Sequence, residues 1–230
     1  MTKQSTRKKI VFVIVEGPSD ETAVGSVLSH VFEGTRVFVH IVGGDITTQT
    51  PENGDIAAKV SAIVKGEASI YHWRASDIER IIHLVDMDGA YVPESAVRQD
   101  PARKHIRYYE NEIRTPDRDS IIERNARKRR NLNKLIKETE MWKHVPYQVF
   151  YMSCNLDHVL YGELNMPDST KVDAAYRLAA LYRRDPEAFV EFMTDSPFSV
   201  DGDFEATWDY IRSGTRSLHR HSNLHLALMD

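Results

Sequence analysis

The chain has 230 residues, of which 41% are hydrophobic and 28% are charged, and its net charge is −4 at pH 7. This balance excludes an intrinsically disordered chain, and the length suffices for one well-buried core. The apolar runs are far shorter than the roughly 20 residues that span a bilayer, and the basic start (MTKQSTRKK) lacks the apolar core of a signal peptide. The chain has one cysteine, Cys154, which excludes an internal disulfide framework. We therefore expect a cytoplasmic protein with no membrane segment.

The first element is an apolar run rich in β-branched residues, Ile10–Val15, which predicts a strand buried on both faces, as in a parallel sheet. The run ends at Glu16 and a Gly-Pro turn. Apolar residues at helical spacing follow, and they predict a helix over residues 20–32 that Ser19 or Asp20 caps. A carboxylate that ends a buried strand lies where open α/β sheets place their chemistry.

The following segments continue the alternation of strand and helix. We expect strands at 36–42, 81–85 and 147–152, helices at 56–65 and 155–161, and a polar loop in TTQTPENG. This order implies an α/β fold whose parallel sheet has right-handed crossovers. After Asp168 the pattern is purely helical, and we expect three helices between about Thr170 and Arg212.

The third predicted strand also ends on carboxylates, in the segment RIIHLVDMDG over residues 80–89. Residues two apart on an extended chain point the same way, so Asp86 and Asp88 are expected to project together, with Gly89 allowing a sharp exit. Two such carboxylates repel each other unless a cation compensates them. Mg²⁺ suits this role because it needs only one or two protein carboxylates and keeps several waters.

Together these two motifs resemble the TOPRIM domain of topoisomerases, primases and several small nucleases. The matching residues are Glu16, Gly17 and Asp20 in VEGPSD, and Asp86 and Asp88 in VDMDG. The resemblance implies a TOPRIM/Rossmann-like parallel sheet flanked by helices over residues 1–165. It leaves a long basic helical insertion at 90–145 and a C-terminal helical extension at 166–230 that packs on the sheet.

The resemblance also implies a function, namely metal-dependent phosphodiester hydrolysis of DNA or RNA. Glu16, Asp86 and Asp88 would be catalytic. The same three residues, with Asp20 and with Asp157 just beyond the fourth strand, would surround Mg²⁺, or Mn²⁺ in its place. Stand-alone TOPRIM chains of this size are similar to small bacterial nucleases of antiviral, phage-defence systems, which implies an ATPase partner protein; a homodimer is a further expectation.

The predicted insertion is the basic part of the chain. Between Arg103 and Lys143 there are 13 Lys and Arg against seven Asp and Glu, whereas the rest has 17 against 27. A helix over 120–138, opened by a Ser120/Glu123 capping box, carries the charges. The candidate phosphate contacts are Arg124, Arg127, Lys128, Arg129, Arg130 and Lys134. Tyr108, Tyr109 and Trp142 are candidates to stack on bases. A solvated helix and buried aromatics are the alternative interpretation.

Two other functions compete with the nuclease hypothesis. The DMDG motif also resembles the DxD loop of haloacid-dehalogenase-like phosphatases, although here it follows a third strand rather than the first. A non-catalytic module that binds nucleic acid or a partner through the basic segment is the second alternative. His219, His221 and His225 offer a transition-metal or phosphate site near the end of the sequence, and Asp157 has the alternative role of favouring a helix dipole.

Overall fold

Four apolar runs of the sequence form a parallel sheet in the computed structural model, which describes residues 8–50 and 54–229. The parallel strands are β1 (Ile10–Val15), β2 (Arg36–Ile41), β3 (Ile78–Asp86) and β8 (Val145–Ser153). The strand order is β2-β1-β3-β8-β7, with the short antiparallel strands β7 (Glu140–Met141) and β9 (His221–Ser222) both paired to β8. The predicted α/β class and its mostly parallel sheet are therefore confirmed. Strands β3 and β8 extend beyond their predicted ranges of 81–85 and 147–152, whereas β2 ends one residue before its predicted end at 42.

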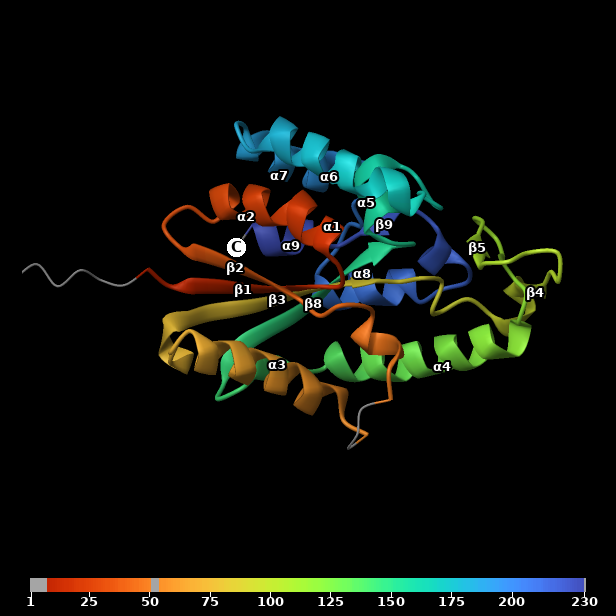
Figure 1. Ribbon diagram of the computed structural model, residues 1–230, viewed down its shortest axis with the longest axis horizontal. Coiled ribbons are helices and arrows are strands. Elements are labelled where there is room, and N and C mark those ends of the chain that lie inside the picture. The colour runs from red at the N-terminus through yellow and green to blue at the C-terminus, as the bar shows by residue number, and fades with distance from the viewer. Residues whose placement is uncertain (1–7, 51–53, 230) are drawn as a thin grey trace, which may run out of the picture.

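Helices cover both faces of this sheet (Figure 1). Phe12 and Ile14 belong to the core on the side of α3 (Ile56–Ile70) and α4 (Arg118–Leu135). Val11 and Val13 face the opposite core, which also contains residues of α2 (Ser26–Val31), α6 (Asp168–Tyr182) and α7 (Pro186–Asp195). All six residues of β1 are buried, which explains why the run is uniformly apolar rather than alternating.

The helix after β1 differs from the prediction in its start and in its regularity. It begins as α1 (Pro18–Asp20), directly after Gly17, so neither Ser19 nor Asp20 is the cap. A π-helical segment, η1 (Glu21–Gly25), then joins α1 to α2. Gly25 lies so close to β2 that an added Cβ would be 3.2 Å from Cγ2 of Val39, which accounts for glycine at this contact.

The insertion at 90–145 was predicted to be helical, but the structure shows that it also contains strands. Three short strands form a separate small sheet in the order β4-β6-β5, namely β4 (Val97–Gln99), β5 (Arg107–Tyr108) and β6 (Ile113–Thr115). They are too short to produce an apolar pattern in the sequence. Helix α4 begins earlier than predicted, because Asp117 rather than Ser120 is its N-cap and accepts the Ser120 N–H at 3.1 Å.

The C-terminal third packs against the sheet and contributes to both cores. The three expected helices are α6, α7 and α8 (Phe204–Ile211), and Phe189 of α7 and Trp208 of α8 are fully buried. The remaining short elements are α5 (Leu156–Tyr161), α9 (His225–Leu228), η2 (Ile46–Thr48), η3 (Ala75–Asp77), η4 (Glu94–Ala96) and η5 (Arg216–Leu218).

Two sequence features fall partly outside the structure. The basic start of the chain and the middle of the predicted TTQTPENG loop include residues 1–7 and 51–53, which are not among the described residues. Within 8–50 and 54–229, we find no helix with the length and apolarity that crossing a membrane requires.

Candidate functional site

Three of the predicted acidic residues meet at the carboxyl edge of the sheet. Glu16 follows β1 and Asp86 ends β3, and these strands are parallel neighbours. The backbone N–H of Asp86 donates a hydrogen bond to Oε1 of Glu16 at 3.3 Å. Asp88, two residues further on, lies within electrostatic range of both carboxyl groups. The strand order predicted this convergence.

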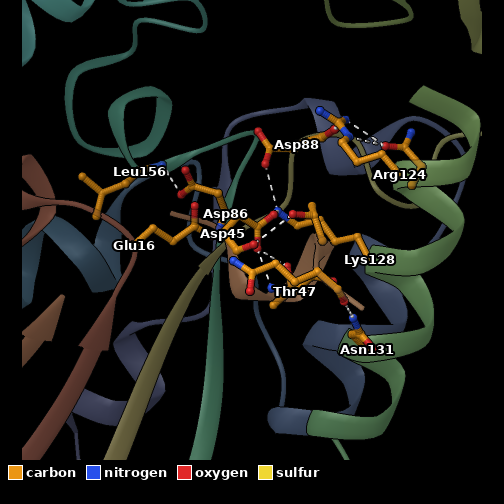
Figure 2. Close-up of polar contacts among 12 residues, drawn as sticks. Glu16, Asp45, Thr47, Asp86, Asp88, Arg124, Lys128, Asn131 and Leu156 are labelled. Atoms are coloured by element: carbon orange, nitrogen blue, oxygen red, sulfur yellow. Dashed lines mark hydrogen bonds and ion pairs between the residues drawn. The ribbon is translucent and has the colours of Figure 1, made fainter. Parts of the chain in front are cut away.

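Asp86 and Asp88 do not project together, however, because the chain stops being extended between them. Strand β3 ends at Asp86, and Asp88 has a left-handed backbone with φ of 49°, which aspartate tolerates better than most residues. The Asp86 carboxylate accepts the Leu156 N–H at 2.8 Å, whereas that of Asp88 accepts from Lys128. Figure 2 shows the two side chains directed toward these different partners. The expected parallel projection is therefore wrong.

Glu16 and Asp86, which we call the unbridged pair, are half-buried carboxyl groups within electrostatic range of each other. Burial raises the pKa of Glu16 well above its usual range, although Lys128 acts in the opposite direction. Burial likewise raises the pKa of Asp86, and the neighbouring charge of Glu16 raises it further. The hydrogen bonds described above come from backbone N–H groups and bring no full positive charge. This pair therefore favours either a bound proton or a bound cation.

Asp45 and Asp88, which we call the lysine-bridged pair, share one ammonium group. Nζ of Lys128 lies 2.7 Å from Oδ2 of Asp45 and 2.8 Å from Oδ2 of Asp88, and its side chain is 0% exposed. Burial alone would lower the pKa of Lys128, but the Asp88 and Asp45 carboxylates raise it well above its usual value. Burial alone would raise the pKa of Asp88, but Lys128 and Arg124 outweigh it and lower that pKa.

Sequence analysis missed Asp45, although a signal was present. Asp45 follows β2, whose carboxyl end lies at the same edge as those of β1 and β3, after Gly43 and Gly44. Both glycines have positive φ, at 70° and 120°, so the chain turns there before it reaches the site. Counting acids after every predicted strand, rather than matching two motifs, would have found this residue.

The basic residues of α4 divide between the site and the surface. Lys128 faces inward, and Arg124 donates to the backbone oxygen of Asp88 at 2.8 Å and to the Tyr108 hydroxyl at 2.9 Å. Neither side chain is placed as the surface phosphate contact that we had expected. The apolar neighbours Leu132 and Leu135 explain this, because they turn the same face of the helix toward the core.

The other predicted phosphate contacts lie nearer to solvent. Lys134 forms an ion pair with Asp55 at 2.8 Å and is 43% exposed. Arg127 donates to Oγ1 of Thr50 at 3.4 Å and is half-buried. Arg129 is half-buried and Arg130 is exposed. The predicted stacking residues are also partly engaged, since Tyr108 contacts Arg124.

Asp20 and Asp157, the two outer metal-ligand candidates, have partners of their own. The Asp20 carboxylate accepts the Gly17 N–H at 2.8 Å. Burial raises the pKa of Asp20, and the charge of Asp157 adds to this. Asp157 is buried and lies 3.0 Å from Nζ of Lys171. Its charge is therefore already compensated by α6, which sequence analysis did not anticipate.

The histidines near the C-terminus do not form a metal site. The rings of His219 and His221 are 6.0 Å apart, and Nδ1 of His225 contacts Oγ of Ser199 instead. Over the part of the chain that the structure describes, no group of three or more His, Cys, Asp or Glu side chains is arranged to hold a metal ion. Cys154 is fully buried, and burial raises the pKa of its thiol well above the usual value, as expected for a structural cysteine.

Comparisons with known proteins give no match. No family model matches the chain, and no curated protein or solved structure matches it either. The resemblance to TOPRIM domains thus rests on the two sequence motifs and on the strand ends that carry them.

Proposed function

We propose that this chain is a TOPRIM-like, Mg²⁺-dependent nuclease that hydrolyses phosphodiester bonds in DNA or RNA. One observation carries the proposal. The unbridged pair, Glu16 and Asp86, joins two adjacent parallel strands at their carboxyl ends, is half-buried, and has pKa values that desolvation raises. Carboxyl groups that burial and mutual repulsion perturb in this way are typical of functional sites.

The side chains present fit a divalent cation in charge and in chemistry. Four carboxyl groups, from Glu16, Asp45, Asp86 and Asp88, face the cationic side chains of Lys128 and Arg124. Negative charge is therefore in excess, and oxygen donors suit Mg²⁺ and Mn²⁺. A set of three ready-made ligands is not required, because Mg²⁺ in phosphoryl-transfer sites takes one or two carboxylates together with waters and substrate phosphates.

Each residue then has a distinct role. Asp86 and Glu16 would hold the cation, which when bound polarises a phosphoryl oxygen and lowers the pKa of the attacking water. In the absence of the cation, burial raises the pKa of Glu16, so the same carboxyl group takes up a proton more readily. Asp88 is oriented by Lys128, and Arg124 holds the backbone oxygen of Asp88 in place.

A cleavage assay tests this proposal. Labelled DNA and RNA are incubated with the purified chain in Mg²⁺, in Mn²⁺ and in a chelator. We expect metal-dependent cleavage that falls at least about 100-fold in Asp86→Asn, the range seen when a group acting on the transition state is removed. Asp209→Asn is the matched control, because Asp209 is exposed and its ion pair is with nearby Arg212, outside the site. Full activity in a folded Asp86→Asn variant would contradict the mechanism.

The same assay separates the alternatives. Hydrolysis of a small phosphomonoester without nucleic-acid cleavage would favour the phosphatase hypothesis. Nucleic-acid binding without any hydrolysis would favour a non-catalytic module. The antiviral role and the ATPase partner follow from the TOPRIM resemblance alone, and copurification of the tagged chain from its native host tests for such a partner.

A further inference from the structure

Lys128 occupies an unusual position, because its ammonium group lies between two carboxylates that come from different loops. Asp45 belongs to the segment after β2, Asp88 to the segment after β3, and Lys128 to α4 of the insertion. Figure 2 shows the lysine reaching from the helix to both carboxylates. Lys128 is at least 40 positions from either aspartate in the sequence, so this arrangement is tertiary.

The helix holds this lysine firmly at its place. One turn before it, the Asn125 side-chain amide donates to the backbone oxygen of Gly89 at 3.2 Å. One turn after it, the Asn131 amide donates to the backbone oxygens of Thr47 and Gln49 at 2.7 and 3.0 Å. These bonds attach α4 to the two loops that carry Asp88 and Asp45. The ammonium group is therefore a built-in positive charge rather than a flexible surface side chain.

The ammonium group lies between two carboxylates and within electrostatic range of Glu16 and Asp86, which is comparable to the setting of a second cation in a two-metal site. In two-metal sites the ions lie about 3.5–4 Å apart and share carboxylate ligands, so that both the attacking and the leaving oxygens face a positive charge. Here the second set of carboxylates, the lysine-bridged pair, already has a positive charge between them, since Lys128 lies 2.7 and 2.8 Å from Asp45 and Asp88. The unbridged pair beside it has no comparable partner among the described residues.

We propose that Lys128 takes the place of a second metal ion, so that the site binds a single divalent cation, at Glu16 and Asp86. This inference rests on the proposed function. In it Lys128 is a positioning residue that orients Asp88, and the ammonium supplies the positive charge that a second ion would otherwise bring. Removal of the ammonium should leave Asp45 and Asp88 as a vacant pair of carboxylates able to take a second cation.

The test counts bound metal ions rather than measuring activity. Mn²⁺ is titrated into the metal-free chain by calorimetry, with folding of each variant checked by circular dichroism. We expect one ion per chain in the wild type and two in Lys128→Met, which keeps an unbranched side chain of similar length but removes its charge. Lys134→Met is the matched control, since it removes an ion pair with Asp55 from the same helix outside the site, and it should bind one ion.

The outcomes separate this inference from the proposed function. Two ions in the wild type, or one ion in both the wild type and Lys128→Met, would overturn the role of Lys128 and leave the nuclease proposal standing. No ion in the wild type would overturn both. If Lys128→Met does not fold, Lys128→Gln, whose amide still donates a hydrogen bond, takes its place with the same expected count. Adding Asp45→Asn to the lysine variant should return the count to one, which places the second ion at Asp45.

Discussion

Asp86 and Asp88 are two residues apart, both are half-buried, and their pKa values shift in opposite directions. Asp86 belongs to the unbridged pair, where burial and Glu16 raise its pKa. Asp88 belongs to the lysine-bridged pair, where Lys128 and Arg124 overcome burial and lower its pKa. Burial alone would raise both pKa values, so the position of the nearest cation decides the sign.

This difference divides one acidic edge into two parts with different tasks. In the lysine-bridged pair, Lys128 of the insertion contacts both Asp45 and Asp88, which attaches the insertion to the edge of the sheet. The unbridged pair has raised pKa values and, among the residues that the structure describes, no cationic partner in direct contact. It is therefore the part that can gain most from a ligand of positive charge.

The largest effect should come from removing the shared ammonium. Lys128→Met leaves two carboxylates without their cation, and breaking a buried pair in this way typically costs about 3–5 kcal/mol. The free energy of unfolding, measured by urea denaturation in a chelator, should fall by that amount. Lys134→Met removes a largely exposed ion pair and should cost less than about 1 kcal/mol. Equal losses in the two variants would show that the division drawn here is wrong.

The second effect concerns the cation. A ligand bound only by the folded chain at 100 times its dissociation constant stabilises it by about 2.7 kcal/mol. For a chain of this size that corresponds to a rise in melting temperature of roughly 5–10 °C. Mg²⁺ should produce such a rise in the wild type and in Asp209→Asn, and a much smaller one in Asp86→Asn. Differential scanning calorimetry on the same preparations makes the comparison. An equally large rise in the melting temperature of Asp86→Asn would show that the unbridged pair is not the binding site of the cation.

The third effect is a pH dependence of stability that has opposite sign for Asp86 and Asp88, measured without metal. A carboxyl group with a raised folded-state pKa stabilises the fold at low pH, and this stabilisation is lost as the pH rises through that pKa. As the pH rises above the unfolded value near 3.8, the free energy of unfolding of Asp86→Asn should therefore increase relative to that of the wild type, by at most about 1.4 kcal/mol per pH unit.

Asp88 should behave in the reverse manner. Its folded-state pKa is lowered, so its ionised form stabilises the fold above the unfolded value near 3.8 and this contribution disappears as the pH falls below it. Asp88→Asn should be less stable than the wild type at neutral pH, and the difference should shrink in acid. Urea denaturation curves from about pH 3 to pH 8 measure both variants across the range in which these groups titrate. Parallel pH profiles for Asp86→Asn and Asp88→Asn would contradict the proposed division.

The smallest effect should come from the outer side of the same helix. Replacing Arg127, Arg129 and Arg130 by Gln leaves Lys128 in place and removes only charges near the surface. Affinity for nucleic acid should decrease similarly for unrelated sequences, and the slope of log affinity against log salt should fall by about one for each phosphate that is no longer bound. Lys65→Gln on α3 is the control, because this lysine is also exposed. An unchanged slope would show that these arginines do not contact phosphates, and it would support the alternative interpretation of α4 as a helix with a solvated outer face.

Much of the fold was predictable because it depends on local pattern. Uniform apolar runs such as Ile10–Val15 indicate strands that are covered on both faces, and their alternation with helical spacing led to a parallel sheet. The small sheet of the insertion escaped prediction, since its strands have two or three residues each and little apolar periodicity. The cap at Asp117 was missed because Ser120 offered an equally plausible local motif.

The sequence by itself determined which carboxylates end the strands, because a strand's end and the acid after it are local features. Glu16 and Asp86 were identified on that basis and lie together in the structure. Only the tertiary structure decided which of the acids has a cation beside it. Lys128 is 83 residues from Asp45 and 40 from Asp88, and no periodicity in the chain relates such positions. The sign of each pKa shift depends on distances of a few ångströms between such residues, which are set by how the insertion packs on the sheet.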